Sequence, residues 1–382
     1  MAESTSELRW DPLERHWVLI AKDRSQRPFD FLPAPRRLVD RASTPCPFCL
    51  VIAGHGPQTR IAERRRVRLA VPNADHHPRV AWTGAEMASR ERFTEDLVLA
   101  LANRYPVLSI ETPTTRRAVG PYAMMSGVGA HEVIVETTQH DQALADMPDE
   151  QRQQVLLMWR DRAEDLVRDR RIAHVQVFKN EGPRAGASLE HAHSQIVASP
   201  VRPSRVERLV ENTRAHYLDT ERCLVCDMLD FETQNDTRHR LVAAEGGFIA
   251  WCPYASARPF EVHLAPRRHA ARFTLSDEDA LQLSKLLGRV LRALGVALAN
   301  ADLNLVLDLA PSPDQIGRGH HGLSHLNEAW HWRLEVVPRL LPYGGFELGT
   351  GTLINPTTPE DAAAHLRMLI DGERAQNDES SP

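Results

Sequence analysis

The chain has 382 residues, a length that favours two domains, or one large sheet with additions, over a single small core. Charged residues make up 25% and hydrophobic residues 42%, with a formal net charge of −5, as in a globular protein. This balance argues against a nucleic-acid backbone or a membrane as partner and leaves a small anionic substrate open. The N-terminus is polar and no apolar run approaches the roughly 18 residues of a membrane span, so we expect a cytoplasmic protein.

Two Cys-x-x-Cys pairs are the first chemical signal along the chain. Cys46 and Cys49 lie in the first half, and Cys223 and Cys226 lie in the second. In a chain without a secretion signal, paired cysteines at this spacing are typical of metal ligation and not of a disulfide framework. The fifth cysteine, Cys252, is expected to be a small buried apolar residue.

The features that follow each cysteine pair occur in the same order in both halves, which predicts an internal duplication. Each half has an extended segment ending in histidine, an amphipathic helix, a strand, a loop and a second strand that carries a histidine. The helices are expected from about residue 149 to 168 and from Ser276 to about Ala299, where Ser276 and Asp279 form a capping-box pattern. The sequence predicts three parts: a first half at 1–200, a second half at 201–371 and a disordered polar tail at 372–382.

The run from Glu190 to Val197, just after a Gly/Ser loop at 182–188, is the most informative stretch of the chain. If this run is a strand, alternate side chains share a face, so His191, His193 and Gln195 would point into one cleft. A neutral histidine is nucleophilic, and the phosphoramidate that it forms can be attacked again by a second acceptor. A histidine pair on a half-buried strand is more often structural than catalytic, so the other motifs in the chain are needed to distinguish the two roles.

Each half also offers four ligands of the kind that tetrahedral zinc prefers, two thiolates and two imidazoles. The expected sets are Cys46, Cys49, His140 and His191, and Cys223, Cys226, His269 and His331. The gaps between these ligands are too long for a zinc finger, which argues against DNA recognition. Four protein ligands leave no open position for water, so we expect two structural zinc ions per chain and a catalyst elsewhere.

His193 is the expected catalyst, because it lies two residues beyond a metal ligand and beside the Gly/Ser loop, whose backbone N–H groups could bind phosphate. Gln195 is expected to donate its amide to a phosphoryl oxygen. The counterpart of His193 in the second half is Arg333, which cannot act as a nucleophile. We therefore expect the first half to carry the nucleophile and the second half to retain only the fold.

Several motifs, spread over nearly the whole length, match one family in order. The matching segments are Arg9-Trp10-Asp11-Pro12, Trp17-Val18-Leu19-Ile20, Cys46-Pro47-Phe48-Cys49, Asn103-Arg104-Tyr105-Pro106, Phe178-Lys179-Asn180, Gly186-Ala187-Ser188 and Gly345-Phe346-Glu347. In these segments the chain resembles the galactose-1-phosphate uridylyltransferases, within the histidine-triad superfamily. This resemblance implies an α+β fold, in which a histidine-triad-like unit is duplicated, antiparallel sheets carry helices on one face, and the active site lies at a homodimer interface.

The resemblance also implies a double displacement of the kind used in galactose metabolism. A nucleotide sugar would give its nucleoside monophosphate to His193 and release a sugar 1-phosphate, and a second sugar 1-phosphate would then collect the nucleotide. His193 matches the nucleophile, Gln195 its phosphate-binding amide and His191 a zinc ligand. The substrate-binding residues that the same likeness implies are Arg24, Arg27, Asn103, Asn180, Gly186, Ser188, Phe346 and Glu347.

Three departures from the family's pattern bear on the substrate. Ala192 stands between the histidines where proline is usual, Leu341 occupies the place of a lysine that meets the sugar phosphate, and the well-known uridylyltransferases lack the second cysteine pair. The two pairs and the run from Phe346 to Gly351 look more like the sister ADP-glucose phosphorylases. The primary hypothesis is a nucleotidyltransferase acting on UDP-glucose and hexose 1-phosphate. The alternatives are an ADP-glucose phosphorylase with the same covalent histidine and inorganic phosphate as acceptor, a nucleotidyl hydrolase, and a nucleotide-binding protein without turnover.

Overall fold

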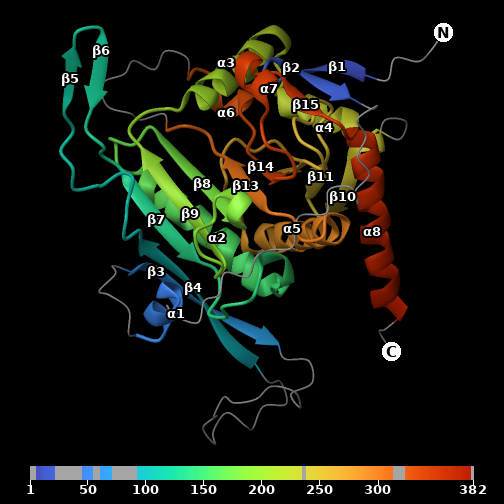
Figure 1. The fold of residues 1–382 in the computed structure, drawn as a ribbon, viewed down its shortest axis with the longest axis horizontal. Helices are drawn as coiled ribbons and strands as arrows, with labels where there is room; N and C mark the ends of the chain where they lie inside the picture. Colours follow the sequence, from blue (N-terminus) through green and yellow to red (C-terminus); the bar gives the residue numbers. More distant parts are fainter. Residues whose placement is uncertain are drawn as a thin grey trace, which may run out of the picture.

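A ten-stranded antiparallel sheet forms the centre of the molecule (Figure 1). The computed structural model describes residues 6–21, 45–54, 61–70, 93–234, 238–312 and 323–379. In spatial order the strands of this sheet are β10 (Leu241–Glu245), β11 (Phe248–Trp251), β12 (Val262–Pro266), β14 (Arg333–Pro338), β13 (Leu303–Asp308), β8 (His174–Glu181), β9 (His193–Ser199), β7 (Ala130–Val135), β4 (Phe93–Ala102) and β3 (Ile61–Ala70).

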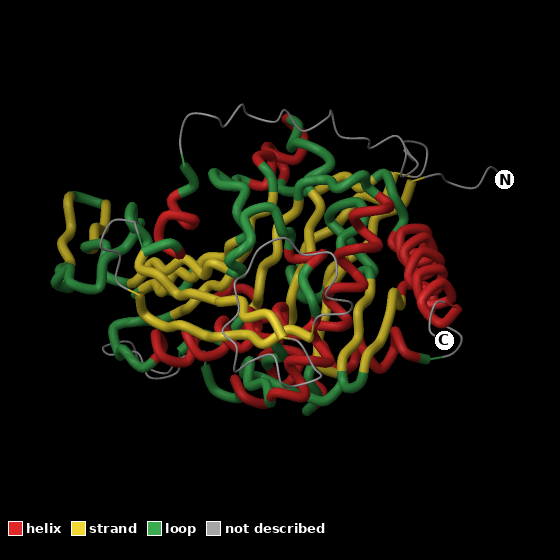
Figure 2. The backbone as a smooth tube through the Cα atoms, turned by 90° about the horizontal axis from the view of Figure 1, so that it is seen from below, coloured by secondary structure: helices red, strands yellow, loops and turns green. Residues whose placement is uncertain are grey.

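Two long helices, α2 (Asp149–Val167) and α5 (Asp277–Ala297), cover one face of this sheet (Figure 2). The apolar side of α5 is buried against the strands, as its helical spacing predicted. Ser276 caps α5 by accepting from the Asp279 N–H at 3.0 Å, while Asp279 accepts from the Ser276 N–H, so the capping box is confirmed. The other helices are α1 (Pro47–Ile52), α3 (Ser204–Thr220), α4 (Leu224–Thr233), α6 (Leu326–Ala329), α7 (Gly345–Thr350), α8 (Pro359–Glu379) and the short 3-10 helices η5 (Leu144–Asp146), η6 (Pro183–Ala185) and η7 (Arg238–Arg240).

The strand order confirms the internal duplication. The first half is ordered β3-β4-β7-β9-β8 and the second β10-β11-β12-β14-β13, with α2 and α5 in equivalent places in the chain. The halves meet where β8 pairs with β13, and Phe178 faces Val306 in that register. The two halves therefore share one continuous sheet, with equivalent strands placed symmetrically about the β8–β13 pair.

The N-terminal hairpin does not pack with the half in which the sequence placed it. Strands β1 (Ser6–Asp11) and β2 (His16–Ala21) form a small sheet with β15 (Leu353–Asn355), which runs parallel to β2. Leu13 lies in the apolar cluster of the second half, and its carbonyl accepts from Asn212 at 2.7 Å. Residues 6–21 thus belong structurally with the second half, because their apolar and hydrogen-bonding partners are there.

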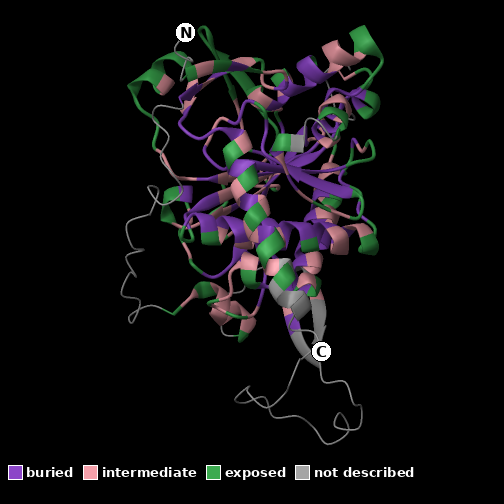
Figure 3. Ribbon diagram, turned by 90° about the vertical axis from the view of Figure 1, so that its right-hand side faces the viewer, coloured by how far each residue is buried: buried purple, intermediate pink, exposed green. Residues whose placement is uncertain are grey.

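The C-terminal helix corrects a second expectation. Residues 372–379 were expected to be disordered, but α8 continues through Glu379. Arg292 on α5 forms an ion pair with Glu373 at 2.6 Å, which attaches this part of α8 to the rest of the protein. Figure 3 shows α8 with half-buried and exposed residues mixed along it, in front of the buried central strands. The prediction of disorder from polar composition was wrong for residues 372–379, because the segment contains good helix formers and no proline before residue 382.

A further two-stranded hairpin, β5 (Arg116–Val119) and β6 (Tyr122–Met125), projects from the β7 side of the molecule (Figure 1). None of the helices in the described part of the chain combines the length and the apolar character that crossing a membrane requires.

Candidate active site and metal centres

The first cysteine pair meets the two expected histidines. Cys46 and Cys49 lie at the start of α1, His140 follows β7 and His191 closely precedes β9. One ligand atom from each of the four residues lies within 4.8 Å of the others. The Cys49 Sγ is 3.4 Å from His140 Nδ1 and 3.5 Å from His191 Nδ1, and the Cys46 Sγ is 3.8 Å from His191 Nδ1.

The second cluster has the same construction. Cys223 and Cys226 lie at the start of α4, and the Cys226 Sγ is 3.5 Å from His269 Nδ1 and 3.4 Å from His331 Nδ1. The Cys223 Sγ lies 4.0 Å from His331 Nδ1. The four ligand atoms again lie within 4.8 Å of one another. In both clusters the fold thus brings together cysteines and histidines that lie more than 100 residues apart in the sequence.

Both clusters fit a tetrahedral zinc ion. Zn–S bonds of about 2.3 Å and Zn–N bonds of about 2.0 Å place sulfur and nitrogen ligands about 3.6 Å apart, close to the separations found here. Three of the rings turn Nδ1 toward the thiols, while Nε2 donates to a backbone carbonyl. Those carbonyls belong to Thr137 for His191, Asn327 for His269 and Pro266 for His331, at 2.9, 2.7 and 3.0 Å. Such outer hydrogen bonds are characteristic of metal-binding histidines, because they fix the ring and its tautomer.

A buried carboxylate supports the first cluster, and no motif in the sequence indicated it. Asp96 on β4 accepts from the Thr137 hydroxyl and from the Thr138 N–H, both at 2.7 Å. These bonds fix the turn between β7 and His140, whose Thr137 carbonyl holds His191. The role of Asp96 depends on this long-range packing, so only the folded chain reveals it.

The strand that carries His193 begins later than expected. β9 starts at His193, so His191 precedes the strand and its ring belongs to the metal cluster. His193 and Gln195 lie on the same face of β9, as predicted. Ser194, between them, accepts a hydrogen bond from Trp159 of α2 at 2.7 Å. Phe48 of α1 contacts both histidine rings, with centroids 5.8 Å from His191 and 5.2 Å from His193. The first metal cluster and His193 therefore form one packed unit.

The hydrogen bonding of His193 leaves Nε2 as the ring nitrogen with a lone pair. Its Nδ1 donates to the His191 carbonyl at 2.9 Å, so a neutral ring carries its proton on Nδ1. Burial, and next the nearby Lys179 ammonium, lower the pKa of His193 to about 4. The imidazole is thus neutral at physiological pH, as attack on phosphorus requires.

A buried ion pair lies directly behind His193. Lys179 on β8 is 2% exposed, and its Nζ binds the fully buried Glu136 carboxylate at 2.8 Å and the His193 carbonyl at 3.2 Å. This ammonium therefore links β8, the end of β7 and the first residue of β9. It fixes the backbone of His193 and supplies a positive charge that helps to keep the His193 ring neutral.

Two amides of the expected substrate site have fixed partners. Gln195 Oε1 lies 2.9 Å from His131 Nε2, and Asn180 Oδ1 accepts from Asn304 Nδ2 at 2.8 Å. No sequence motif pointed to His131 or Asn304. His131 shares a strand pair with Gln195, and Asn304 faces Asn180 across the pairing of β8 with β13. The sequence could not indicate His131 or Asn304, because each lies far along the chain from the amide that it contacts. Only the register of the paired strands brings them together.

The backbone of the Gly/Ser loop is not available in the way that the sequence suggested. Its N–H groups at 185, 186 and 187 bond to carbonyls within the loop, and the N–H of Arg184 donates to Asp302 Oδ2 at 2.5 Å. Gly182 and Gly186 have φ values of 84° and 91°, which close this compact turn around η6. The expected phosphate cradle of backbone N–H groups is therefore wrong for residues 184–187. Ser188, which is exposed, offers its hydroxyl at the end of the loop.

In the second half, a buried ion network occupies the position equivalent to His193. Arg333, the first residue of β14, is 2% exposed and contacts Asp308 at 2.6 Å and Glu335 at 3.0 Å. Arg205 contacts the same two carboxylates and Glu14 of the N-terminal hairpin. Arginine cannot deprotonate to attack phosphorus. The network instead holds residues 6–21 through the ion pair of Arg205 with Glu14.

The remaining predicted residues lie in two different parts of the chain's fold. Asn103 lies beside His131, with its Oδ1 accepting from the Tyr105 N–H at 2.9 Å. Phe346 and Glu347 lie on α7, which leads into β15, the partner of β2, and which Figure 1 shows far from α1. Glu347 accepts there from the Gly344 N–H at 2.9 Å. Arg24 and Arg27 lie outside the described residues.

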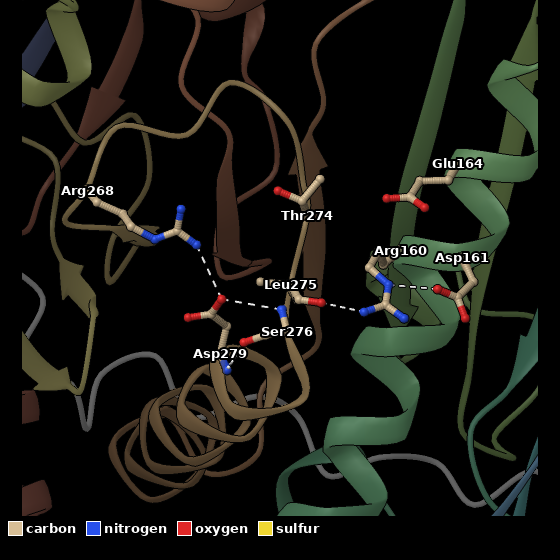
Figure 4. Close-up of a pocket in the computed structure, with 8 residues that line it drawn as sticks. All are labelled: Arg160, Asp161, Glu164, Arg268, Thr274, Leu275, Ser276 and Asp279. Atoms are coloured by element: carbon tan, nitrogen blue, oxygen red, sulfur yellow. Dashed lines mark hydrogen bonds and ion pairs between the residues drawn. The ribbon is translucent and has the colours of Figure 1, made fainter.

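A surface groove lies between α2 and the start of α5 (Figure 4). Its two arginines are paired, since Arg160 bonds Asp161 at 2.7 Å and Arg268 contacts Asp279 at 3.2 Å. The lining residues are Arg160, Asp161, Glu164, Arg268, Thr274, Leu275, Ser276 and Asp279. We assign no chemistry to this groove.

The duplicated sheet, the two Cys/His clusters and a buried neutral histidine define a nucleotidyltransferase of the histidine-triad kind. Residues 82–203 match the family model described as galactose-1-phosphate uridyl transferase, N-terminal domain. The chain is 30% identical to an ADP-glucose phosphorylase of Arabidopsis thaliana, over 95% of this chain and 93% of that protein. It is 28% identical to a galactose-1-phosphate uridylyltransferase of Thermotoga maritima, over 94% and 98% of the two chains.

Comparison with solved structures agrees with these sequence relatives. The crystal structure of an ADP-glucose phosphorylase from Arabidopsis thaliana with bound ADP-glucose superposes with a TM-score of 0.69 at 26% identity. The match covers 95% of this chain and 98% of that one. The chain belongs to the galactose-1-phosphate uridylyltransferase family, in which these relatives and the shared fold place it over nearly its whole length.

Proposed function

We propose that the protein transfers a nucleoside monophosphate from a nucleoside diphosphate hexose to a hexose 1-phosphate, with UDP-glucose as donor and galactose 1-phosphate as acceptor. His193 carries the nucleotide between the two steps. The observation that supports this most strongly is the hydrogen bond from His193 Nδ1 to the His191 carbonyl, which leaves a neutral Nε2 free to attack. The homologous uridylyltransferase and the family model support the choice of substrate.

The proposed reaction has two in-line displacements at the α-phosphorus. In the first, His193 Nε2 forms a bond to phosphorus while the bond to the bridging oxygen breaks, and hexose 1-phosphate leaves with that electron pair. In the second, a phosphate oxygen of the acceptor hexose 1-phosphate attacks phosphorus, and the bond to Nε2 breaks. Gln195, Asn180 and Ser188 donate hydrogen bonds to the phosphoryl oxygens. Donors fixed in advance stabilise the charge that builds up in each transition state.

Mass spectrometry of the intact protein after brief mixing with UDP-glucose, and separately with ADP-glucose, tests this proposal. A uridylyl adduct that disappears when galactose 1-phosphate is added is the expected result. Release of free UMP without an acceptor would indicate a hydrolase, and absence of any adduct with either donor would contradict the covalent mechanism.

A second candidate function is phosphorolysis of ADP-glucose through the same histidine. It is favoured by the second Cys/His cluster, and by the 30% identity with the Arabidopsis ADP-glucose phosphorylase over 95% of the chain. In the same experiment this enzyme would form an adenylyl adduct, and inorganic phosphate would remove that adduct as ADP.

We also propose that each Cys/His cluster holds a structural zinc ion. The donor set and the outer hydrogen bonds support zinc, and four protein ligands leave no position for water or substrate. Zinc would hold α1 against the segments that bear His140 and His191, and thereby place Phe48 against His193. The chemistry remains with the imidazole.

Replacing single ligands separates the two metal sites. His191→Ala should reduce bound zinc from two ions per chain to one and strongly slow labelling of His193, because the anchor next to the nucleophile is lost. His331→Ala, the matched control, should also lose one zinc but keep most of the labelling rate. Metal analysis together with adduct formation makes the comparison, and equal loss of labelling in both variants would contradict the division of roles.

We further propose a homodimer in which α7 of each subunit completes the substrate site of its partner. The separation of α7 from α1 within one chain supports this arrangement. Phe346 and Leu348 on α7 are 49% and 75% exposed, which suits an element that meets another molecule. Phe346 and Glu347 would then contact the sugar phosphate bound near the nucleophile of the other subunit.

A further inference from the structure

We propose that His131 and Asn304 are positioning residues that set the orientation of the amides of Gln195 and Asn180, so that both NH2 groups face the reacting phosphate. The inference rests on the proposed transfer through His193. It goes further because it assigns a role in catalysis to one residue of each half, including the half that has no nucleophile.

The contact at Nδ1 sets the tautomer of His131. The backbone N–H of Val107 donates to His131 Nδ1 at 3.2 Å, so that nitrogen carries no proton. The ring proton is therefore on Nε2, which lies 2.9 Å from Gln195 Oε1 and donates to it. Asn103 Nδ2 is 3.1 Å from the same Nε2, a contact between two donors that adds no hydrogen bond. His131 thus holds the oxygen of the Gln195 amide.

Gln195 must then direct its NH2 group away from His131. Its side chain projects from the same face of β9 as His193, two residues along the strand. Since its carbonyl oxygen is occupied, the group left for a substrate is a donor. A donor is what a phosphoryl oxygen requires, whereas a reversed amide would present a lone pair to it.

The orientation of the Asn180 amide follows more directly, because one hydrogen-bond partner of Asn304 is a backbone carbonyl, which can only accept. Asn304 Nδ2 donates to the Ala185 carbonyl at 2.9 Å and to Asn180 Oδ1 at 2.8 Å. The backbone carbonyl identifies the Asn304 atom as nitrogen, and therefore the Asn180 atom as oxygen. The Asn180 Nδ2 lies beside Gly186, where an added Cβ would be 3.5 Å away. Like Gln195, Asn180 therefore presents its NH2 group, a hydrogen-bond donor, next to the Gly/Ser loop.

The two contacts come from strand pairs on opposite sides of the nucleophile. His131 lies on β7, which pairs with β9, and Asn304 lies on β13, which pairs with β8 at the register Asn304 to Asn180. The β8–β13 pairing that joins the halves therefore brings a second-half residue to the phosphate site. Loss of one preorganised donor commonly reduces the rate about 10²-fold, which is the effect expected when an amide reverses.

A double-mutant cycle tests the inference. Asn304→Asp keeps the size of the side chain but cannot donate to Asn180 Oδ1, so it should slow single-turnover labelling of His193 about 10²-fold, with a much smaller change in KM. In an Asn180→Ala background the same substitution should cost almost nothing, because its target is gone. Asn304→Ala, which introduces no charge, should show the same dependence on Asn180. His131→Phe should likewise slow labelling when Gln195 is present and not in Gln195→Ala.

Zinc content and thermal unfolding of each variant serve as structural controls. A cost of Asn304→Asp and Asn304→Ala that persists unchanged in Asn180→Ala would overturn the inference, as would labelling at the wild-type rate in the single variants. Failure of the wild-type protein to form any adduct would instead overturn the proposed function, so the two ideas fail separately.

Discussion

His193→Ala should abolish formation of the nucleotidyl adduct and reduce turnover by roughly 10⁴-fold or more, the scale seen when a covalent nucleophile is removed. The reason is that Nε2 of this ring forms the bond to phosphorus in the proposed reaction. Intact-protein mass spectrometry and a coupled rate assay measure the two effects. The variant should keep both zinc ions, since His193 is not among the cluster ligands.

His365→Ala is a suitable control, because His365 lies half-buried on α8, in a different part of the structure. That variant should label and turn over at the wild-type rate. If His193→Ala lost zinc together with labelling, the separation between a structural metal and a catalytic imidazole would be wrong. A persistent adduct in His193→Ala would show that another residue is the nucleophile.

Arg333→Met should lower the free energy of unfolding by about 3–5 kcal/mol, as expected when one partner is removed from a buried ion network. Asp308 and Glu335 would lose a cation that is fully enclosed with them, and Arg205 alone would have to balance both. Urea denaturation of the zinc-loaded protein measures the change. Arg168→Met is the matched control, because the Arg168 side chain is 77% exposed and 4.0 Å from Asp165, so its loss should cost less than about 1 kcal/mol.

The Arg333 network also gives a pH signature. Burial by itself raises the pKa of Glu335, but Arg205 and Arg333 outweigh it and lower that pKa to about 2. A carboxyl whose pKa is lower in the folded protein stabilises it fully above its unfolded pKa of about 4.3, and this stabilisation is lost as the pH falls toward 2. Arg333→Met raises the pKa of Glu335. Acid unfolding of the variant should therefore begin at a higher pH than acid unfolding of the wild type. Identical acid transitions would contradict the assigned network.

Local patterns were sufficient for the repeated units of the fold. The helical spacing of leucines along α5 and the capping pair at its start are properties of adjacent turns, so the sequence shows them directly. The duplication was visible for a similar reason, because each half repeats its cysteine pair, helix and histidines in one order. The metal sets also followed from residue type, since two thiolates and two imidazoles per half are the donors that a tetrahedral zinc site uses.

Long-range packing decided the features that sequence patterns missed or placed wrongly. The N-terminal hairpin lies on the second half because Glu14 and Leu13 find their partners there. The loop N–H groups at 184–187 are used within the protein, which depends on its turn geometry and on the distant Asp302. Neither effect has a local signal.

The sequence by itself determined which groups this protein has: a histidine after the Gly/Ser loop, two sets of two cysteines and two histidines, and a duplicated α+β framework. Only the tertiary structure decided how these groups are oriented. The bond from His193 Nδ1 to a carbonyl selects its reactive nitrogen, and His131 and Asn304 select the direction of two amides. The physical reason is that hydrogen-bond direction depends on which atoms lie within about 3 Å, and strand register and packing bring those atoms together from distant positions in the chain.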